Sequence, residues 1–411
     1  MIFNADLHVH GKYSGATSNK MIPSMMAQEA KKKGIQLLGT GDCLHSVWLR
    51  EFKRKATVID DGTIEINGVR FVFTAEVEDK HRVHHLILFP DIAAIDEFKD
   101  SFSKHSKNMD VDGRPRINVC GRDIADIALQ IDALIGPCHA FTPWTSLYAY
   151  FSSLKECYGD LANKIHFIEL GLSADSDYAD RIEELHSLTF LTNSDAHSPH
   201  PVRLAREFNR MEAPDVNYEG LRKAILRKGG RVLLNVGLPP QEGKYHESAC
   251  IRCYKHYTLS EARKAGWRCQ CGGIIKKGVK DRVEELADFE KARHPEHRPP
   301  YVHIIPLAEI IAKALKKKTP FCREVIALWN TLISRFGDEV TVLLDAKIDD
   351  IERVAGRFVA CAVEDFRTGR VRIKPGGGGK YGVVEISEEC MSDDEEGIIE
   401  GQSKLDRYLG W

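Results

Sequence analysis

Short apolar segments alternate with amphipathic segments from residue 1 to about residue 240. The segments with the composition of strands are 3–10, 35–42, 71–78, 83–89, 134–140, 167–173, 188–195 and 232–238. The segments between them that carry apolar residues at helical spacing include 21–34, 91–102, 175–188 and 218–230. Strands this apolar, in repeated alternation with helices, predict a parallel sheet covered by helices. Seven or eight such units predict closure into a barrel.

The alternation ends at Pro239 and Pro240, and two further regions follow. Residues 241–280 hold a cluster of cysteines, and residues 281–411 are charged, with amphipathic helical segments at 306–318, 322–337 and 349–369. We therefore expect three domains, at 1–240, 241–280 and 281–411. Residues 374–382 predict a flexible turn, because Tyr381 follows Gly-Lys where a phosphate loop has Ser or Thr. The acidic residues near the end, 392–397, predict a mobile segment.

Composition narrows the class of protein. A chain of 411 residues with 43% hydrophobic residues is long enough for two or three cores. It contains no apolar run of about 18 residues, so we expect no membrane span. The first ten residues lack the features of a signal peptide, so we expect a cytoplasmic protein. In that compartment the eleven cysteines indicate metal ligands or buried thiols rather than disulfides.

The charge of the chain is unevenly distributed. Between Arg222 and Lys280 there are 14 Lys and Arg residues against 3 Asp and Glu residues, a balance of +11, whereas the remainder of the chain carries −13. A basic segment that includes a cysteine cluster favours a polyanionic partner such as nucleic acid. The alternative is a basic surface that only contacts solvent.

Ionisable residues recur at the carboxyl ends of the expected strands, where a barrel of this kind builds its site. The candidate metal ligands are His8, His10, Asp42, Glu76, His85, His139, Asp195 and His197. Imidazole and carboxylate ligands together suit zinc, manganese or iron, and an all-oxygen set would suit magnesium. More than four ligands imply two or three ions, with Glu76 or Asp195 as a bridging carboxylate. Such a site best serves phosphoester hydrolysis.

Six motifs resemble the ordered motifs of the PHP (polymerase and histidinol phosphatase) superfamily. They are "DLHVHGKYS", "GTGD", the Glu of "TAEVE", "HLILF", "PCHAF" and "NSDAH". The resemblance implies a distorted (β/α)7 barrel with up to three metal ions, held by His8, His10, Glu76, His139, Asp195 and His197. Asp42 stands where many members have histidine, with His45 as a nearby alternative, and His84 competes with His85. Gly15 stands where some relatives carry an acidic ligand.

Four cysteines predict a second metal site. Cys250, Cys253, Cys269 and Cys271 form a C-x2-C pair and a C-x-C pair, a spacing typical of a closed, structural zinc site. Free thiols are the alternative. Among the residues between them, Arg252 and Lys255 could neutralise phosphates, and Tyr257 and Trp267 could stack on bases. The two aromatic rings could instead fill the core of the small module.

The order of barrel, four-cysteine module and helical region resembles the endonuclease Q family over roughly the full length. The resemblance implies hydrolysis of DNA immediately 5′ to hypoxanthine, uracil, xanthine or an abasic site, with the helical region contacting DNA. It implies damaged DNA as the partner, and replication or repair proteins are candidate protein partners.

Direct hydrolysis would then depend on Asp195 and His197, which would hold the catalytic ion, with Glu76 and His139 completing the catalytic set. A base-reading pocket is expected beside them, from residues 141–148 with Trp144 and residues 171–175 with the amides of Leu172 and Ser173. Two other functions remain open: a small-molecule phosphatase of the histidinol-phosphate type, and a non-catalytic DNA-binding protein.

Overall fold

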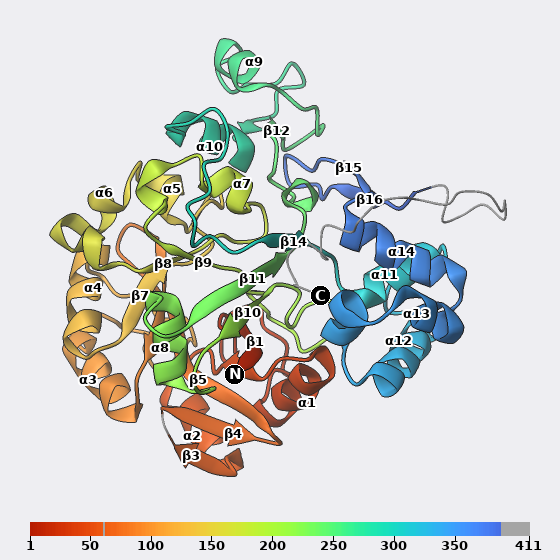
Figure 1. Cartoon of the computed structure of the whole chain (residues 1–411). Helices are drawn as coiled ribbons and strands as arrows, with labels where there is room; N and C mark the ends of the chain where they lie inside the picture. The colour runs from red at the N-terminus through yellow and green to blue at the C-terminus, as the bar shows by residue number, and fades with distance from the viewer. Residues whose placement is uncertain (61, 388–411) are drawn as a thin grey trace.

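A curved sheet of ten strands forms the centre of the protein (Figure 1). The computed structural model describes residues 1–60 and 62–387. The sheet runs in the order β14-β11-β10-β1-β2-β5, and β5 then pairs with β4 through residues 69–72 and with β6 through residues 73–78. β3 and β7 continue these two branches. The strands are β1 Ile2–Asp6, β2 Leu37–Gly39, β3 Val58–Asp60, β4 Thr63–Ile66, β5 Val69–Glu78, β6 His84–Phe89, β7 Leu134–Pro137, β10 Phe208–Glu212, β11 Arg231–Gly237 and β14 Tyr301–His303.

Two further strands complete a distorted barrel. β8 (Phe167–Glu169) and β9 (Thr189–Leu191) form a parallel pair. The amide of Ala140, just after β7, donates to the carbonyl of Glu169 at 2.9 Å, and the amide of His10, just after β1, donates to the carbonyl of Ala196 at 2.9 Å. Backbone hydrogen bonds therefore link the ends of seven strands, β1, β2, β5, β6, β7, β8 and β9, into a ring. The predicted α/β barrel is confirmed.

The barrel wall is not uniformly parallel, in contrast to the sequence prediction. β6 runs antiparallel to both β5 and β7, and β10 runs antiparallel to β1 and β11. Residues 79–83 connect β5 to β6 and are too few for a helical crossover, so the two strands form a hairpin. This hairpin fixes which residues of β6 face the barrel interior.

Helices lie around the outside of the barrel strands (Figure 1). The helices of this region are α1 Pro23–Lys33, α2 Ser46–Lys55, α3 Ile92–Phe102, α4 Gly121–Gln130, α5 Leu147–Tyr150, α6 Leu154–Tyr158, α7 Ser176–Ala179 and α8 Tyr218–Leu226, with the short turns η1 Gly159–Lys164, η2 Glu183–Leu185 and η3 Pro240–Glu242. The predicted helix over 175–188 is divided into α7 and η2. The reason is tertiary: the buried carboxylate of Asp180, between them, accepts hydrogen bonds of 2.8–3.1 Å from Arg298.

The cysteine module and the helical region follow the barrel. The module contains β12 Ala249–Cys250, α9 Leu259–Lys264 and β13 Ile275–Lys276. The later elements are α10 Val279–Leu286, α11 Leu307–Ala314, α12 Arg323–Phe336, the π-helical turn η4 Thr341–Asp345, α13 Ile348–Ala355, α14 Arg357–Thr368, and the hairpin of β15 Arg372–Lys374 and β16 Val383–Glu385. The predicted helix over 349–369 breaks at Gly356, whose φ of 83° lies in the left-handed region.

Two segments differ from the boundaries expected from sequence. β14 lies within the expected helical domain but pairs with β11 of the barrel sheet. The glycine-rich turn at 374–382 is tied to the barrel's final loop, because the amides of Gly376 and Gly379 donate to the carbonyls of Gln241 and Lys244 at 2.9 Å each. A Cβ at Gly376 would lie 2.6 Å from the carbonyl oxygen of Gly243, so this approach requires glycine. The acidic segment 392–397 lies outside the described residues.

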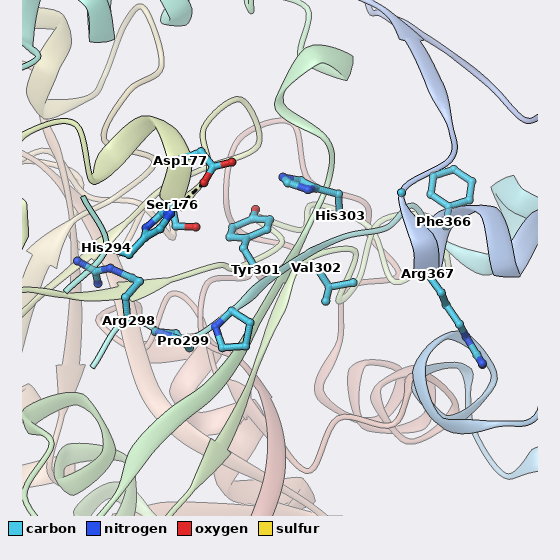
Figure 2. A pocket seen from close by; sticks show the side chains of 12 residues that line it. Ser176, Asp177, His294, Arg298, Pro299, Tyr301, Val302, His303, Phe366 and Arg367 are labelled. Carbon is cyan, nitrogen blue, oxygen red and sulfur yellow. Dashed lines mark hydrogen bonds and ion pairs between the residues drawn. The ribbon is translucent and has the colours of Figure 1, made fainter. Parts of the chain in front are cut away.

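A cleft of 360 Å³ lies where β14 passes between α7 and α14 (Figure 2). Two basic side chains that line the cleft pair with carboxylates of the barrel. His303 lies 2.9 Å from Asp175, and Arg298 pairs with Asp180. These pairs tie the β14 segment to the loop that carries α7. Within the described part of the chain, the helices are all too short or too polar to cross a membrane.

Candidate metal centre and adjoining pocket

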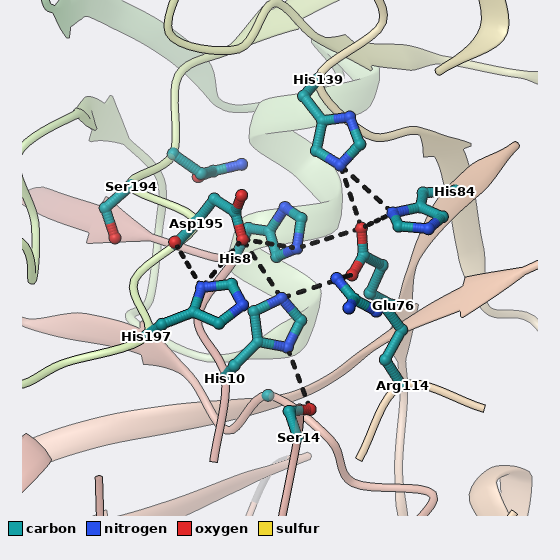
Figure 3. Close-up of polar contacts among 12 residues, drawn as sticks. His8, His10, Ser14, Glu76, His84, Arg114, His139, Ser194, Asp195 and His197 are labelled. Carbon is teal, nitrogen blue, oxygen red and sulfur yellow. Dashed lines mark hydrogen bonds and ion pairs between the residues drawn. The ribbon is translucent and has the colours of Figure 1, made fainter. Parts of the chain in front are cut away.

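Five imidazoles converge on two carboxylates at one end of the barrel (Figure 3). Glu76 lies at the middle of one group, with its carboxylate oxygens 3.3 Å from His10 Nε2, 3.1 Å from His139 Nε2 and 2.5 Å from His84 Nδ1. Asp195 Oδ1 lies 3.2 Å from His10 Nε2 and 3.8 Å from His8 Nε2. The donor atoms fall into three groups, each within 4.8 Å: His8 with His10 and Glu76, His10 with Asp195 and His197, and Glu76 with His84 and His139. Glu76 and His10 each belong to two groups, so the arrangement suits adjacent cations.

Each of these imidazoles is held by its other ring nitrogen. Nδ1 of His8 lies 2.9 Å from Glu169 Oε2, Nδ1 of His10 lies 3.0 Å from Asp42 Oδ1, and Nε2 of His84 lies 3.3 Å from Glu78 Oε2. Nδ1 of His139 contacts the Thr142 hydroxyl at 3.2 Å, and Nδ1 of His197 donates to the Asp195 carbonyl at 3.0 Å. Such outer contacts are typical of metal-binding histidines, because they fix the tautomer and aim the free nitrogen at the ion.

Three residues that end barrel strands adopt backbone conformations unusual for side-chain-bearing residues. Asp42, His139 and Asp195 have φ values of 51°, 30° and 47°, in or near the left-handed region. Each such residue costs about 1–3 kcal/mol and persists only where surrounding contacts hold it. Asp6 supplies one such contact, because its buried carboxylate accepts hydrogen bonds from the Ser194 amide at 3.0 Å and hydroxyl at 2.6 Å. The turn before Asp195 is thereby fixed to β1.

The donor set fits divalent cations. His8 Nε2, His10 Nε2 and Asp195 Oδ1 are buried without a hydrogen-bond partner among the described residues. Buried polar atoms are rarely left in this state unless an ion, water or ligand completes them. Imidazole nitrogens with carboxylate oxygens are ligands that zinc, manganese and iron accept.

The histidines and carboxylates of the cluster shift one another's pKa values. Burial alone would lower the pKa of His8, but the adjacent carboxylates of Glu169 and Glu76 raise that pKa well above its usual range. Burial alone would also lower the pKa of His10, but the carboxylates of Asp195 and Asp42 raise it well above its usual value. Burial alone would raise the pKa of Glu76, but His84 and His10 hold it well below its usual range. Without a cation, protons on the histidines therefore neutralise the carboxylates.

We expect metal binding at this centre to release protons and to strengthen as the pH rises. Because the pKa values of His8 and His10 are raised, both rings are protonated near neutral pH, and a cation must displace those protons. The apparent Kd should fall by about tenfold per pH unit for each proton released. Calorimetric titration with Mn²⁺ in buffers of different ionisation enthalpy measures both quantities. Mn²⁺ leaves zinc on the thiolates undisturbed, and a Kd independent of pH would contradict the prediction.

The structure places His84, not the predicted His85, at the metal centre. Side chains alternate across a strand, so His84 lies on the same face as Leu86 and Leu88, whereas His85 points to the opposite face. His85 instead lies beside Asp79 and Tyr158.

Asp42, predicted as a ligand, lies behind His10. Its two oxygens are occupied by His10 Nδ1, by the Gly11 amide at 2.6 Å and by the Ser14 hydroxyl at 2.9 Å. The alternative, His45, accepts a hydrogen bond from the Trp48 amide at the start of α2 and stacks on Tyr13. Gly15 is exposed. The structure thus brings together His8, His10, Glu76, His139, Asp195 and His197, and adds His84.

Sequence reasoning missed Glu169, Asn193 and Arg114. Glu169 ends β8, and its carboxylate contacts His8, the His139 amide and the Asn193 side chain. Its place at a strand end was a usable signal. Arg114 Nη1 lies 3.3 Å from Glu76 Oε2, but it comes from a long loop with no pattern that marks it.

A pocket of 210 Å³ adjoins the metal centre. It reaches His84, His139, Asp195 and Arg114, and it includes Trp144, Leu172 and Ser173, which were expected to form a base pocket. The amides of Leu172 and Ser173 donate no hydrogen bond within the described part of the chain. The far wall was not expected: it consists of Lys244, Tyr245 and Tyr381, from the barrel's last loop and the glycine-rich turn.

Aromatic and basic side chains contact one another at the edge of this pocket, whose lining includes Trp144, Lys244, Tyr245 and Tyr381. Trp144 is 41% exposed and meets Tyr245 edge to face, with ring centroids 4.5 Å apart. Lys276 Nζ lies 4.4 Å from the Trp144 centroid, and Lys244 Nζ lies 5.3 Å and 5.8 Å from those of Tyr245 and Tyr381. Such a rim suits a nucleic-acid strand, with aromatic faces for bases and ammonium groups for phosphates.

The four predicted cysteines lie together. Cys250 Sγ is 3.5 Å from Cys271 Sγ, Cys253 Sγ is 3.5 Å from Cys269 Sγ, and all four sulfurs lie within 4.8 Å of one another. Four sulfurs about 2.3 Å from one zinc would lie about 3.8 Å apart, close to these values. The Tyr257 hydroxyl donates to Cys269 Sγ at 3.0 Å and, as the largest effect, lowers the pKa of that thiol to about 6. The group fits a closed metal site.

In the module two aromatic residues pack against the core, whereas two basic residues are exposed. Tyr257 and Trp267 are half-buried against a small core of Cys250, Ala262, Cys269 and Ile275. That packing favours the core role for the two rings over base stacking. Arg252 and Lys255 are exposed, although Arg252 also donates to the Cys271 carbonyl at 3.0 Å.

Buried imidazoles and carboxylates gathered at one end of an α/β barrel define a metal-dependent hydrolase. The chain is 50% identical to the lesion-specific endonuclease PfuEndoQ of Pyrococcus furiosus, with a TM-score of 0.92 and coverage of 96% of this chain and 98% of that one. It is also 50% identical to endonuclease Q in a complex with a 27-mer duplex substrate bearing an abasic lesion at the active site, with a TM-score of 0.91 and coverage of 96% and 99%. The chain belongs to the endonuclease Q family.

Three further similarities concern proteins without a described function. Residues 306–370 match the family described as the MJ0043 C-terminal domain. The chain is 45% identical to the uncharacterised protein MJ0043 of Methanocaldococcus jannaschii over 277 residues, which cover 66% of this chain and only about a third, 34%, of that protein. It is 31% identical to the uncharacterised protein YqxK of Bacillus subtilis over 403 residues, which cover 93% and 98% of the two chains.

Proposed function

We propose that this protein is a metal-dependent endonuclease that cuts DNA at damaged nucleotides. It hydrolyses the phosphodiester 5′ to hypoxanthine, uracil, xanthine or an abasic site. The observation that carries the proposal is the adjacency of two features: a cluster of metal-binding side chains, and a 210 Å³ pocket with an aromatic and basic rim that opens beside His139 and Asp195. A nucleotide held in that pocket would place its backbone against the cluster.

The residues of the cluster have separable tasks. His8, His10, Glu76, His84, His139, Asp195 and His197 would hold two or three ions of zinc, manganese, magnesium or iron. When bound, such ions orient a phosphate, promote ionisation of water and stabilise the leaving oxygen. Glu169 and Asp42 orient His8 and His10 through their Nδ1 atoms. Arg114, beside Glu76, offers a guanidinium to the charge of the scissile phosphate.

Base selection is assigned to the backbone amides of Leu172 and Ser173. Both are free to donate, and deamination places a carbonyl oxygen where adenine and cytosine carry an amino group. A donor in the pocket therefore pairs with O6 of hypoxanthine or xanthine and with O4 of uracil, and it opposes the amino groups of adenine and cytosine. An abasic nucleotide enters without a base to exclude.

Replacing Ser173 by proline is expected to reduce the preference for uracil over cytosine by about tenfold or more. Proline lacks the amide hydrogen, so one donor to the deaminated base is lost. Single-turnover cleavage of matched duplexes measures the preference. Ser173→Ala keeps the amide and should keep the preference, and Ser173→Pro should retain its metal content and its cleavage of abasic DNA. An unchanged preference in Ser173→Pro would disprove the assignment.

The proposed function is tested with end-labelled duplexes that each carry one uracil, hypoxanthine, xanthine or abasic site. We expect one cut, immediately 5′ to the lesion, that disappears on chelation and returns when metal is added. Release of phosphate from a monoester such as histidinol phosphate, without cutting of DNA, would instead indicate a phosphatase. Binding of these duplexes without cutting in any metal would indicate a non-catalytic DNA-binding protein.

The same proposal implies a cytoplasmic protein that acts on cellular DNA. Replication or repair proteins are its expected protein partners, since a nicked strand needs further processing. The exposed basic residues of the module, Arg252 and Lys255 among them, are assigned to contacts with DNA phosphates.

A further inference from the structure

A second buried cluster of potential ligands lies on the outer side of β6. Asp79 follows β5, His85 lies in β6, and Cys157 lies in α6; one donor atom from each falls within 4.8 Å of the others. Asp79 and His85 are fully buried, and Cys157 is nearly so. Because His85 points away from His84 across the strand, this cluster is separate from the metal centre inside the barrel.

Two atoms of the cluster contact each other as an ion pair but have no hydrogen-bond partner in the described part of the chain. Asp79 Oδ2 and His85 Nε2 are buried and have no hydrogen-bond partner among the described residues, although they lie 3.4 Å apart. A carboxylate oxygen and an imidazole nitrogen that face each other in an apolar interior without a hydrogen bond are unfavourable unless a third group completes them.

The other polar atom of each side chain, His85 Nδ1 and Asp79 Oδ1, has hydrogen-bond partners. The Tyr158 hydroxyl contacts His85 Nδ1 at 2.7 Å, and Asp79 Oδ1 accepts hydrogen bonds from the amides of His81 and Val83 at 2.8 and 2.9 Å. The free nitrogen and the free oxygen are thus aimed at the space beside Cys157. This is the arrangement of outer contacts that orients metal ligands.

A glycine keeps the space beside these atoms open. Gly121 begins α4, which packs against α6, and a Cβ at this position would lie 2.9 Å from Cys157 Sγ and 3.2 Å from His85 Nε2. Any side chain here would crowd the donor atoms.

We propose that Asp79, His85 and Cys157 bind one zinc ion as a structural site. Nitrogen, oxygen and sulfur ligands together suit zinc, and two donors about 2.0–2.1 Å from one tetrahedral zinc lie about 3.3 Å apart, close to the 3.4 Å between Asp79 Oδ2 and His85 Nε2. The burial of the site excludes substrate. The ion would join the β5–β6 turn, β6 and α6 directly behind His84, and so support the barrel wall that carries Glu76 and His84.

The first test is a zinc-edge anomalous difference map from crystals of the unaltered, zinc-loaded chain. We expect a peak within bonding distance of Asp79, His85 and Cys157, in addition to those at the barrel centre and the four cysteines. A map with strong peaks at the four cysteines and none at this cluster would overturn the proposal. This test uses the unaltered chain, so it does not depend on the folding of a variant.

The second test counts metal in variants. Cys157→Ala is expected to lose one zinc per chain by atomic emission, and its cobalt form to lose about one fifth of the thiolate-to-cobalt absorbance, because one of five thiolate ligands is removed. Cys322→Ala, at a cysteine before α12 and outside every ligand group, should retain both values. Equal metal content and absorbance in both variants and the unaltered chain would refute the site.

Discussion

Replacing Glu76 by glutamine is expected to lower the single-turnover rate of cleavage at an abasic site by about 10³-fold or more. Glu76 belongs to two of the three ligand groups, and its carboxylate faces His10, His84 and His139. The amide keeps the size of the side chain but removes a negative charge that would help to hold the cations, and charge stabilisation by such cations contributes several kcal/mol to a transition state. Metal content should fall as well, whereas binding of the duplex in the presence of chelator should be unchanged.

Two other carboxylates on the same part of the sheet provide controls for Glu76→Gln. Within the metal centre Glu78 contacts only the outer nitrogen of His84, and its carboxylate also pairs with Arg82 and Arg116 at the surface. Glu78→Gln should therefore cost about tenfold. Glu65 on β4 pairs with Arg70 away from the site, and Glu65→Gln should leave the rate unchanged. If Glu76→Gln retained its metals and cut within about tenfold of the unaltered protein, the assignment of Glu76 to the centre would fail.

Replacing Cys271 by serine is expected to unfold the module at residues 249–276 and to weaken binding of duplex DNA by about tenfold or more. The core of the module contains four buried residues, two of which are cysteines, so its burial of apolar surface is too small to maintain the fold without a metal. Cys271 is exposed, and the change therefore removes a ligand without opening a cavity. Limited proteolysis should show new cleavage confined to the module, and a binding titration should show the loss of affinity.

A change of ligand type separates the loss of metal from other effects of substitution at Cys271. Histidine also binds zinc, so Cys271→His should restore the metal, the resistance to protease and the affinity for DNA. If Cys271→Ser kept its protease resistance with its zinc removed, the module would be stable without metal and the prediction would be wrong.

The sequence predicted the barrel well because its strands are short apolar runs. All eight expected strands are present, and polar residues placed at their carboxyl ends meet at one end of the barrel. The strands that were not expected, such as β10 and β14, mix polar and apolar residues and depend on their neighbours in the sheet. The family and the fold class inferred from the motifs are confirmed.

The differences between the predicted and the observed placement of site residues come from contacts that sequence spacing does not encode. The hairpin at residues 79–83 pairs Glu78 with His84, which places His84 on the face of Glu76, and a count of strand positions across that turn would have identified it. Asp42 is a strand-end carboxylate, but its oxygens are taken by His10 and Ser14, which only the folded chain shows. Glu169 could have been proposed from its place at the end of a strand, but its contacts with His8, His139 and Asn193 depend on three segments meeting at β8.

The glycine-rich turn has a consequence for the order in which the enzyme matures. Tyr381 lines the same pocket as His84 and Asp195, so segments far apart in the sequence form this one pocket. During translation, barrel strands can pair long before residues 374–382 leave the ribosome, because domains tend to fold from the amino end as they are made. A nascent chain would therefore have its candidate metal ligands before it has the complete wall of the adjoining pocket, which forms only once residues 374–382 have been made.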